Sequence, residues 1–260
     1  MTQITAPPRQ VQQRPQVVED SSDSEEELEF DQVKILVLGD GAVGKTSLIQ
    51  RFVNDHFAQS YKQTIGVDFC TKRLTFEKPT TKQVCLQIWD IGGQSIGGKM
   101  IQSYLHKADA VLLCYDITSF QSFENLKDWL SLVKQHCNAG SSETPDVNDN
   151  FPHLVLVGTK ADLQHLRAVK AIRHTQFCEV ERMKSAHFVS SKLSEGVDTM
   201  FYKVAADLIG ISLTQAQESA YQKPVVAEII DHPRNDPALP VINATHKGAR
   251  SESKKKCAIM

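Results

Sequence analysis

An apolar run at residues 33–38 leads directly into Gly-Asp-Gly-Ala-Val-Gly-Lys-Thr at residues 39–46. This is the pattern G-x-x-x-x-G-K-[S/T], with an expected strand before it and an expected helix after it. Glycines let the main chain curl so that its N–H groups point at phosphate oxygens, and the N-terminus of the following helix favours negative charge. Lys45 is expected to contact the β and γ phosphates, and the Thr46 hydroxyl to ligate Mg²⁺. The residues expected to bind the phosphates are Gly41, Ala42, Val43, Gly44, Lys45, Thr46 and Ser47. We therefore expect a chain that binds a nucleoside triphosphate.

The bulk composition excludes several other classes of protein. A chain of 260 residues with 41% hydrophobic content can bury one substantial core. The net charge of −2 gives no electrostatic basis for binding nucleic acid. Six cysteines without C-x-x-C spacing indicate reduced thiols in a cytoplasmic protein. No apolar stretch approaches the ~20 residues that span a bilayer.

The chain divides into three expected parts. Residues 1–31 form a disordered extension with an acidic run, in which phosphorylation of Ser22 and Ser24 is an alternative to a merely solvated tail. Residues 32–210 form the domain, and residues 211–260 a flexible tail with recurring prolines. Strand-like runs lie near 33–38, 67–76, 83–89, 110–115, 154–158 and 187–189. Amphipathic segments lie near 45–54, 98–107, 120–137, 168–182 and 195–210, and residues 138–152 form an enlarged loop. This alternation predicts an α/β fold with a six-stranded, mostly parallel sheet and helices on both faces.

Three further stretches complete the expected site. The run 83–89 ends in Asp90, which is placed to hold Mg²⁺ through a water, followed by Gly93 for the γ-phosphate and Gln94 for the attacking water. The run 154–158 ends in Thr159-Lys160-Ala161-Asp162. The Asp162 carboxylate can accept two hydrogen bonds from the N1–H and amine of guanine, which adenine does not offer. The Lys160 stem can lie over the purine, and Ser190-Ser191-Lys192 offers a main-chain N–H to the guanine carbonyl.

With these stretches in this order, the chain resembles the small GTPases of the Ras superfamily over about residues 33–210. The resemblance implies a three-layer P-loop NTPase fold that binds GTP or GDP with Mg²⁺ and hydrolyses GTP. It also implies that Phe57 packs on the guanine edge, that Tyr61 covers the phosphates, and that Thr64 binds Mg²⁺ and the γ-phosphate. Gly41 occupies the position where a larger side chain would crowd Gln94. Hydrolysis is then expected to be slow, with an activating protein contributing on the order of 10⁵-fold.

Residues 64–69 and the end of the run 83–89 resemble the Rab branch in particular. In that branch Phe69, Trp89 and Tyr104 match an aromatic triad that faces effectors; ordinary half-buried core aromatics are the alternative. Ile91-Gly92, Ser95 and Gly97-Gly98 depart from the usual Rab pattern and resemble the divergent subgroup named Rab twenty-eight. Thr159 replaces the usual Asn, and its single hydroxyl donor cannot span both the base and the phosphate loop, so a lower nucleotide affinity is expected.

The resemblance implies a switch in which residues 58–68 and 91–103 are ordered by the γ-phosphate and released after hydrolysis. Effectors, an exchange factor and an activating protein are the implied partners of a monomer. A pseudo-GTPase scaffold and an adenine-nucleotide P-loop enzyme are the alternatives.

The last four residues, Cys257-Ala258-Ile259-Met260, match C-a-a-X with the farnesyl preference. Together with Lys254–Lys256 they predict a farnesyl group on Cys257, reversible attachment to the cytoplasmic face of a membrane, and a prenyl-binding carrier. The resemblance points to an endosomal or ciliary compartment.

Overall fold

The structure of the chain is a computed structural model that describes residues 30–77, 81–94, 100–137 and 151–221. Its elements are β1 (Asp31–Leu38), α1 (Lys45–Asn54), β2 (Val67–Phe76), β3 (Lys82–Ile91), α2 (Ile101–Leu105), β4 (Ala110–Asp116), α3 (Phe120–Glu124), α4 (Leu126–Cys137), β5 (His153–Thr159), η2 (Ala161–Leu166), α5 (Ala171–Val180), β6 (Ser185–Phe188), α6 (Val197–Leu208) and α7 (Gln215–Ala220).

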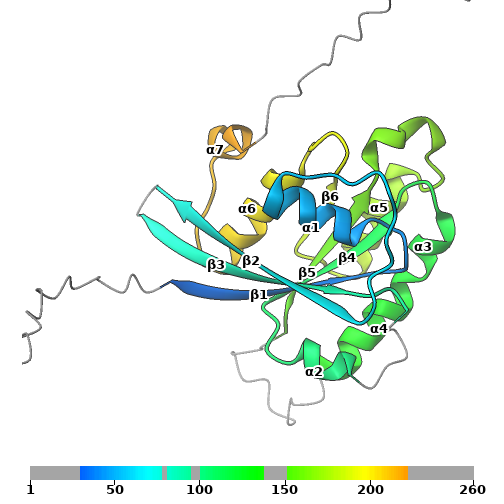
Figure 1. Cartoon of the computed structure of the whole chain (residues 1–260), viewed down its shortest axis with the longest axis horizontal. Coiled ribbons are helices and arrows are strands. Elements are labelled where there is room, and N and C mark those ends of the chain that lie inside the picture. The colour runs from blue at the N-terminus through cyan, green and yellow to red at the C-terminus, as the bar shows by residue number, and fades with distance from the viewer. Residues whose placement is uncertain (1–29, 78–80, 95–99, 138–150, 222–260) are drawn as a thin grey trace, which may run out of the picture. The chain divides into compact units, whose positions relative to one another are not determined.

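One six-stranded sheet runs through the described part of the chain in the order β2-β3-β1-β4-β5-β6 (Figure 1). Only β2 is antiparallel to its neighbour, and the other pairs are parallel. The carboxyl ends of β1, β3, β4 and β5 therefore meet at one edge of the sheet, where open α/β sheets bind ligands. The predicted α/β architecture with a mostly parallel sheet is confirmed.

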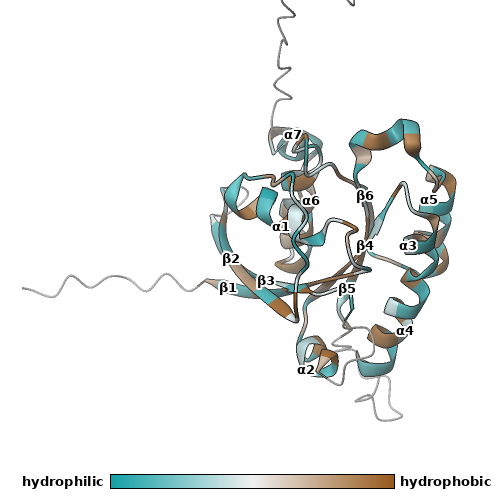
Figure 2. Cartoon of the chain, turned by 45° about the vertical axis from the view of Figure 1, so that its right-hand side comes forward, coloured by the Kyte–Doolittle hydropathy of each residue, from teal (hydrophilic) through white to brown (hydrophobic). Residues whose placement is uncertain are grey.

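Helices cover both faces of this sheet and create two separate hydrophobic cores. Alternate residues of β1 serve the two sides, since Val33, Ile35 and Val37 enter one core and Leu36 and Leu38 the other. The first core is closed by α1 and α6, whose Phe52 and Phe201 rings stack with centroids 4.0 Å apart. The second is closed by α2, α3, α4 and α5. These helices carry both hydrophilic and hydrophobic residues (Figure 2), as amphipathic covering layers do.

Most strand and helix limits lie within three residues of the predictions. Two expected helical segments and one expected strand differ as follows. The expected helical segment 120–137 is interrupted at Asn125, which separates α3 from α4. The expected segment 98–107 contains a helix only over Ile101–Leu105 within the described residues. β6 spans Ser185–Phe188, so it begins two residues and ends one residue before the run expected near 187–189.

Both ends of the domain extend beyond the expected limits of 32 and 210. Asp31 is already in β1, where it pairs with Val84. At the other end Ile211 is buried in the first core, and α7 follows with a capping box between Thr214 and Gln217. The Tyr221 ring stacks on Tyr202 of α6 at 3.9 Å. Residues 211–221 are therefore part of the packed domain rather than of a tail.

No helix of the described residues has the length and apolar character needed to cross a membrane. Several predictions fall outside the described residues: the acidic extension, the enlarged loop over 138–150, the departures at Ser95, Gly97 and Gly98, and the C-terminal segment with Cys257.

Candidate functional site

A cavity of about 810 Å³ opens at the carboxyl edge of the sheet. Its walls come from the phosphate loop and the start of α1, from residues 56–64, from Gly93 and Gln94, and from residues 159–163 and 191–192. Nearly every predicted nucleotide-binding residue therefore meets in one place. Val43 and Ser190 are not among the lining residues, because the Val43 side chain is buried in the first core and Ser190 is fully buried behind Asp162.

The phosphate loop adopts its curl through main-chain conformations that need glycine. Gly39 has φ 141°, and a Cβ there would lie 2.1 Å from the carbonyl oxygen of Cys114. Gly44 has φ 102° and precedes α1 without any side-chain cap, and the first turn contains no acidic residue. The first N–H groups of α1 thus have no intrahelical acceptor and face the cavity, which makes a site for an anion.

Lys45 is the buried cation of the site, with 5% of its surface exposed. Its Nζ donates to the carbonyl oxygens of Gly39 and Asp40 at 2.6 and 2.7 Å. Burial lowers the pKa of this ammonium, and the charge of Asp90 opposes that shift. The hydrogen-bond acceptors of this ammonium among the described residues are neutral carbonyls, and α1 has no side-chain cap at its N-terminus. Such an environment suits a polyphosphate.

Three predicted metal residues converge beside this cation. Thr46 Oγ1 donates to Asp90 Oδ2 at 2.5 Å and lies 2.8 Å from Thr64 Oγ1. The other carboxylate oxygen, Asp90 Oδ1, is buried without a hydrogen-bond partner among the described residues. Burial raises the pKa of Asp90, while the Thr46 hydrogen bond and the charge of Lys45 lower it. A buried carboxylate oxygen without a partner, on an acid whose other oxygen meets two threonine hydroxyls, fits a hydrated Mg²⁺, which takes few protein ligands besides substrate phosphates.

The two expected switch segments touch each other and the phosphate loop here. The Gly92 N–H donates to Gly66 O at 2.8 Å, and a Cβ at Gly92 would lie 2.6 Å from the Thr64 carbonyl oxygen. A Cβ at Gly93 would lie 2.1 Å from the Gly41 nitrogen, so Gly93 packs directly on the loop. Gln94 follows with its side chain exposed at the cavity. Glycine at 92 and 93 is what lets three main-chain segments approach so closely.

The base-side wall is held by two serines and an arginine. Ser190 Oγ donates to Asp162 Oδ1 at 2.7 Å, so it orients the acid rather than the ligand. Arg51 of α1 donates through Nε to the Ser191 carbonyl at 2.7 Å. Sequence reasoning missed Arg51, because its partner lies 140 positions along the chain. Phe57 and Tyr61 also line the cavity, the second with 67% of its surface exposed.

The Thr159 side chain bonds to the phosphate loop. Its Oγ1 lies 2.5 Å from the Val43 carbonyl oxygen and 2.9 Å from that of Tyr115, and only 1% of the residue is exposed. The hydroxyl has one proton, and both neighbours are acceptors, so that proton is committed to the protein. This agrees with the expectation that Thr159 cannot also reach the base.

The aromatic residues expected to face effectors do form one group. Phe69 and Trp89 lie opposite each other in the antiparallel β2–β3 pair, with ring centroids 5.1 Å apart. Tyr104 of α2 lies 5.9 Å from Trp89. Phe69 is 48% exposed, so the group is open to solvent on one side.

Comparison with known proteins gives consistent matches. The sequence model described as the Ras family matches residues 34–210 of the chain. The chain is 39% identical over 240 residues to the Ras-related protein Rab-28 of Caenorhabditis elegans, an alignment that covers 92% of this chain and 91% of that protein. It is 35% identical over 195 residues to the Ypt/Rab-type GTPase YPT7 of Saccharomyces cerevisiae, with 73% and 86% covered. The Ras-related protein Rab-7a of Dictyostelium discoideum is 36% identical over 179 residues, with 68% and 82% covered.

Proposed function

Because the chain belongs to the Ras family and to its Rab branch, and is therefore a GTP hydrolase, we propose that it is a Mg²⁺-dependent switch that recruits membrane-trafficking effectors when GTP is bound. One observation carries this proposal. Thr64 from one switch segment and Gly93 from the other both reach the phosphate loop, beside Lys45. A γ-phosphate in that position would contact both segments, and GDP would contact neither.

Different residues around the cavity bind the phosphates, orient the water, hold the metal and select the base. Lys45 and the first N–H groups of α1 bind and orient the phosphates, and Gln94 orients the attacking water at the open side of the cavity. When bound, Mg²⁺ supplies positive charge for the oxygens that become more negative during the reaction, and Thr46, Thr64 and Asp90 would hold it. Asp162 selects guanine, since its carboxylate accepts from two donors on that base.

The switch itself rests on how weakly residues 58–68 are held. Thr64 is half-buried, whereas Ile65 is 90% exposed and most neighbours are open to solvent. A segment with few buried contacts opens at little cost in free energy, so loss of the γ-phosphate contact releases it. The triad of Phe69, Trp89 and Tyr104 then changes its surroundings, and we propose it as the effector surface.

The test of hydrolysis is single-turnover phosphate release from preloaded GTP, with Gln94→Leu as the variant. We expect slow release by the wild type that is lost in the variant. Equal rates in both would support the alternative of a pseudo-GTPase scaffold that binds nucleotide without cycling. Thermal shifts with GTP and ATP separate out the adenine-nucleotide alternative, because Asp162 predicts stabilisation by GTP alone.

Attachment to a membrane is part of the same proposal. A farnesyl group on Cys257 and the charges of Lys254–Lys256 would together give reversible binding to a cytoplasmic membrane face, with a prenyl-binding carrier in the cytosol. Intact mass and localisation of the wild type beside Cys257→Ser test this. A wild type that lacks the farnesyl mass and localises like the variant would remove the proposal, and leave the GTPase account unaffected.

A further inference from the structure

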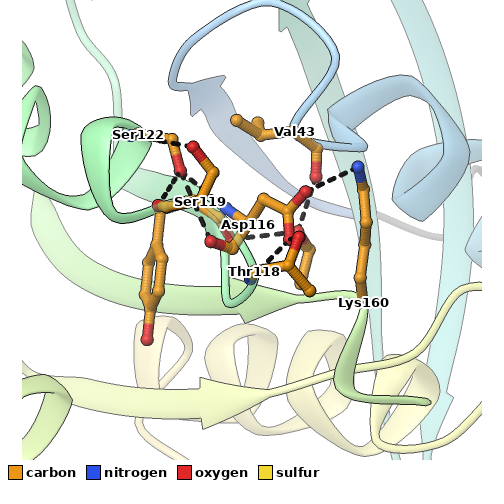
Figure 3. A network of polar contacts seen from close by, with 8 residues as sticks. Val43, Asp116, Thr118, Ser119, Ser122 and Lys160 are labelled. Carbon is orange, nitrogen blue, oxygen red and sulfur yellow. Dashed lines mark hydrogen bonds and ion pairs between the residues drawn. The ribbon is translucent and has the colours of Figure 1, made fainter. Parts of the chain in front are cut away.

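A network of polar contacts around Asp116 lies behind the base-side wall of the cavity (Figure 3). Asp116 is the last residue of β4 and is 7% exposed. Its Oδ2 lies 2.7 Å from Lys160 Nζ, in an ion pair. Its Oδ1 accepts from the N–H of Thr118 at 2.8 Å and from the hydroxyl of the same residue at 2.7 Å. Both oxygens of the carboxylate are therefore engaged, one by a cation and one by a tight turn.

The turn that carries this carboxylate is fixed in its own right. The N–H of Asp116 donates to Ser122 Oγ at 3.1 Å, and that hydroxyl lies 2.9 Å from the carbonyl oxygen of Ser119. Ser119 also caps α3, since its side chain accepts from the Ser122 N–H. Because the buried Ser122 holds the Asp116 main chain and the Thr118 N–H and hydroxyl hold its Oδ1, the carboxylate has little freedom to move. Asp116 is thus a rigid anchor rather than a surface acid that happens to meet a lysine.

Lys160 depends on this anchor for its position. Its main chain is left-handed, with φ 58° and ψ 39°, and it directly precedes η2, which carries Asp162. The Lys160 side chain is 36% exposed. A lysine with that much freedom normally samples many rotamers, and ordering it has an entropic cost. Here Cα is fixed at one end and Nζ at the other, so the four-carbon stem is held along the cavity wall.

We propose that Asp116 is a positioning residue for the nucleotide base: it holds the Lys160 stem as an ordered apolar surface on which a purine ring stacks. The inference rests on the proposed role of Lys160 at the base. Lysine stems cover flat apolar surfaces while their charged ends stay paired or hydrated. With Asp116 in place the ordering of the stem precedes binding, and the base does not have to supply it.

Dissociation of a fluorescent GDP analogue from the full-length protein tests this. We expect Asp116→Asn, which keeps the shape but loses the charge, to release the nucleotide roughly three- to tenfold faster, the range for ordering one long side chain. Lys160→Met keeps most of the stem without the charged end and should release it faster to a similar degree. In the Lys160→Met background, Asp116→Asn should have no further effect, because its only route to the base is gone. Glu124→Gln, which removes an exposed ion pair to Lys127, is the matched control and should leave release unchanged.

Other outcomes decide against the inference. If Asp116→Asn speeds release as much in the Lys160→Met background as in the wild type, Asp116 acts on the fold and the inference is overturned. The same holds if the single-turnover hydrolysis rate of bound GTP falls in Asp116→Asn, because Gln94 lies on the phosphate side and should not sense it. Should Asp116→Asn fail to fold, Thr118→Val, which removes one of the two bonds to Oδ1, carries the same comparison with a smaller expected effect. A wild type that binds no guanine nucleotide would refute the proposed function itself.

Discussion

Replacing Thr159 by Val removes one hydroxyl from the floor of the site and keeps the volume of the side chain. The Thr159 Oγ1 is 2.5 Å from the Val43 carbonyl in the phosphate loop, and the residue is 1% exposed, so water cannot substitute for it. A neutral buried hydrogen bond contributes about 1 kcal/mol net, and an acceptor left unpaired costs about 1–3 kcal/mol. We therefore expect Thr159→Val to lower the free energy of unfolding of the GDP-bound protein by about 1–2 kcal/mol.

The same change should loosen the phosphate loop, because this hydroxyl links the Val43 carbonyl of the loop to β5. If the whole loss of about 1–2 kcal/mol falls on the free energy of nucleotide binding, GDP dissociates about five- to thirtyfold faster. The assay is urea unfolding together with release of a fluorescent GDP analogue. Thr175→Val on the exposed face of α5 is the matched control, since within the described ranges its hydroxyl donates to Ala171 O of its own helix alone. Wild-type stability and release in Thr159→Val would refute this account of Thr159.

Three other predictions follow from particular contacts. Gly39→Ala should destabilise the protein by at least about 2 kcal/mol in urea unfolding, because the new Cβ would meet Cys114 O at 2.1 Å, whereas Gly41→Ala, with no atom within 4 Å, should change stability by less than about 0.5 kcal/mol; similar losses in both would contradict the loop geometry. Burial is the main cause that lowers the pKa of His174 from 6.5 to about 4. The stability that the neutral, buried imidazole contributes is therefore complete above pH 6.5 and is lost as the pH falls toward 4. The drop in unfolding free energy between pH 7 and pH 5 should be smaller by about 2 kcal/mol in His174→Gln than in the wild type, and an equal drop in both would contradict it. Asp162→Asn should abolish the thermal shift with GTP and create one with xanthosine triphosphate, whose C2 carbonyl accepts from the new amide; an unchanged GTP shift would remove Asp162 from the base site.

The parts of this structure that the sequence predicts are those whose signals are local. The limits of α1 and β2 match the predictions residue for residue, because a glycine loop starts the helix and periodicity marks the strand. The convergence of Thr46, Thr64 and Asp90 was also predictable, since each belongs to a motif whose place relative to the strands is known. Strand ends at one edge of a parallel sheet bring such motifs together.

The parts that the sequence did not predict depend on contacts between distant residues. Asp116 ends an apolar strand as many acids do, and nothing local marks Lys160 as its partner. Asp40 accepts hydrogen bonds from Trp129 Nε1 on α4 and from Asn125 Nδ2 just before that helix, both more than eighty positions away. α7 is different, because Thr214 and Gln217 form a capping box that is legible in the sequence. The helix has only six residues, its sequence is QAQESA and none of these residues is buried, so hydrophobic periodicity could not reveal it.

The central claim is that the γ-phosphate decides whether residues 58–68 and 91–103 are ordered. Amide hydrogen exchange of the full-length protein, saturated with Mg²⁺ and either GDP or a non-hydrolysable GTP analogue, measures this directly. We predict slower exchange of both segments in the triphosphate form, with the core strands β1 and β4 equal in the two forms. Equal exchange of both segments in the two nucleotide states, with binding of both nucleotides verified, would contradict the account.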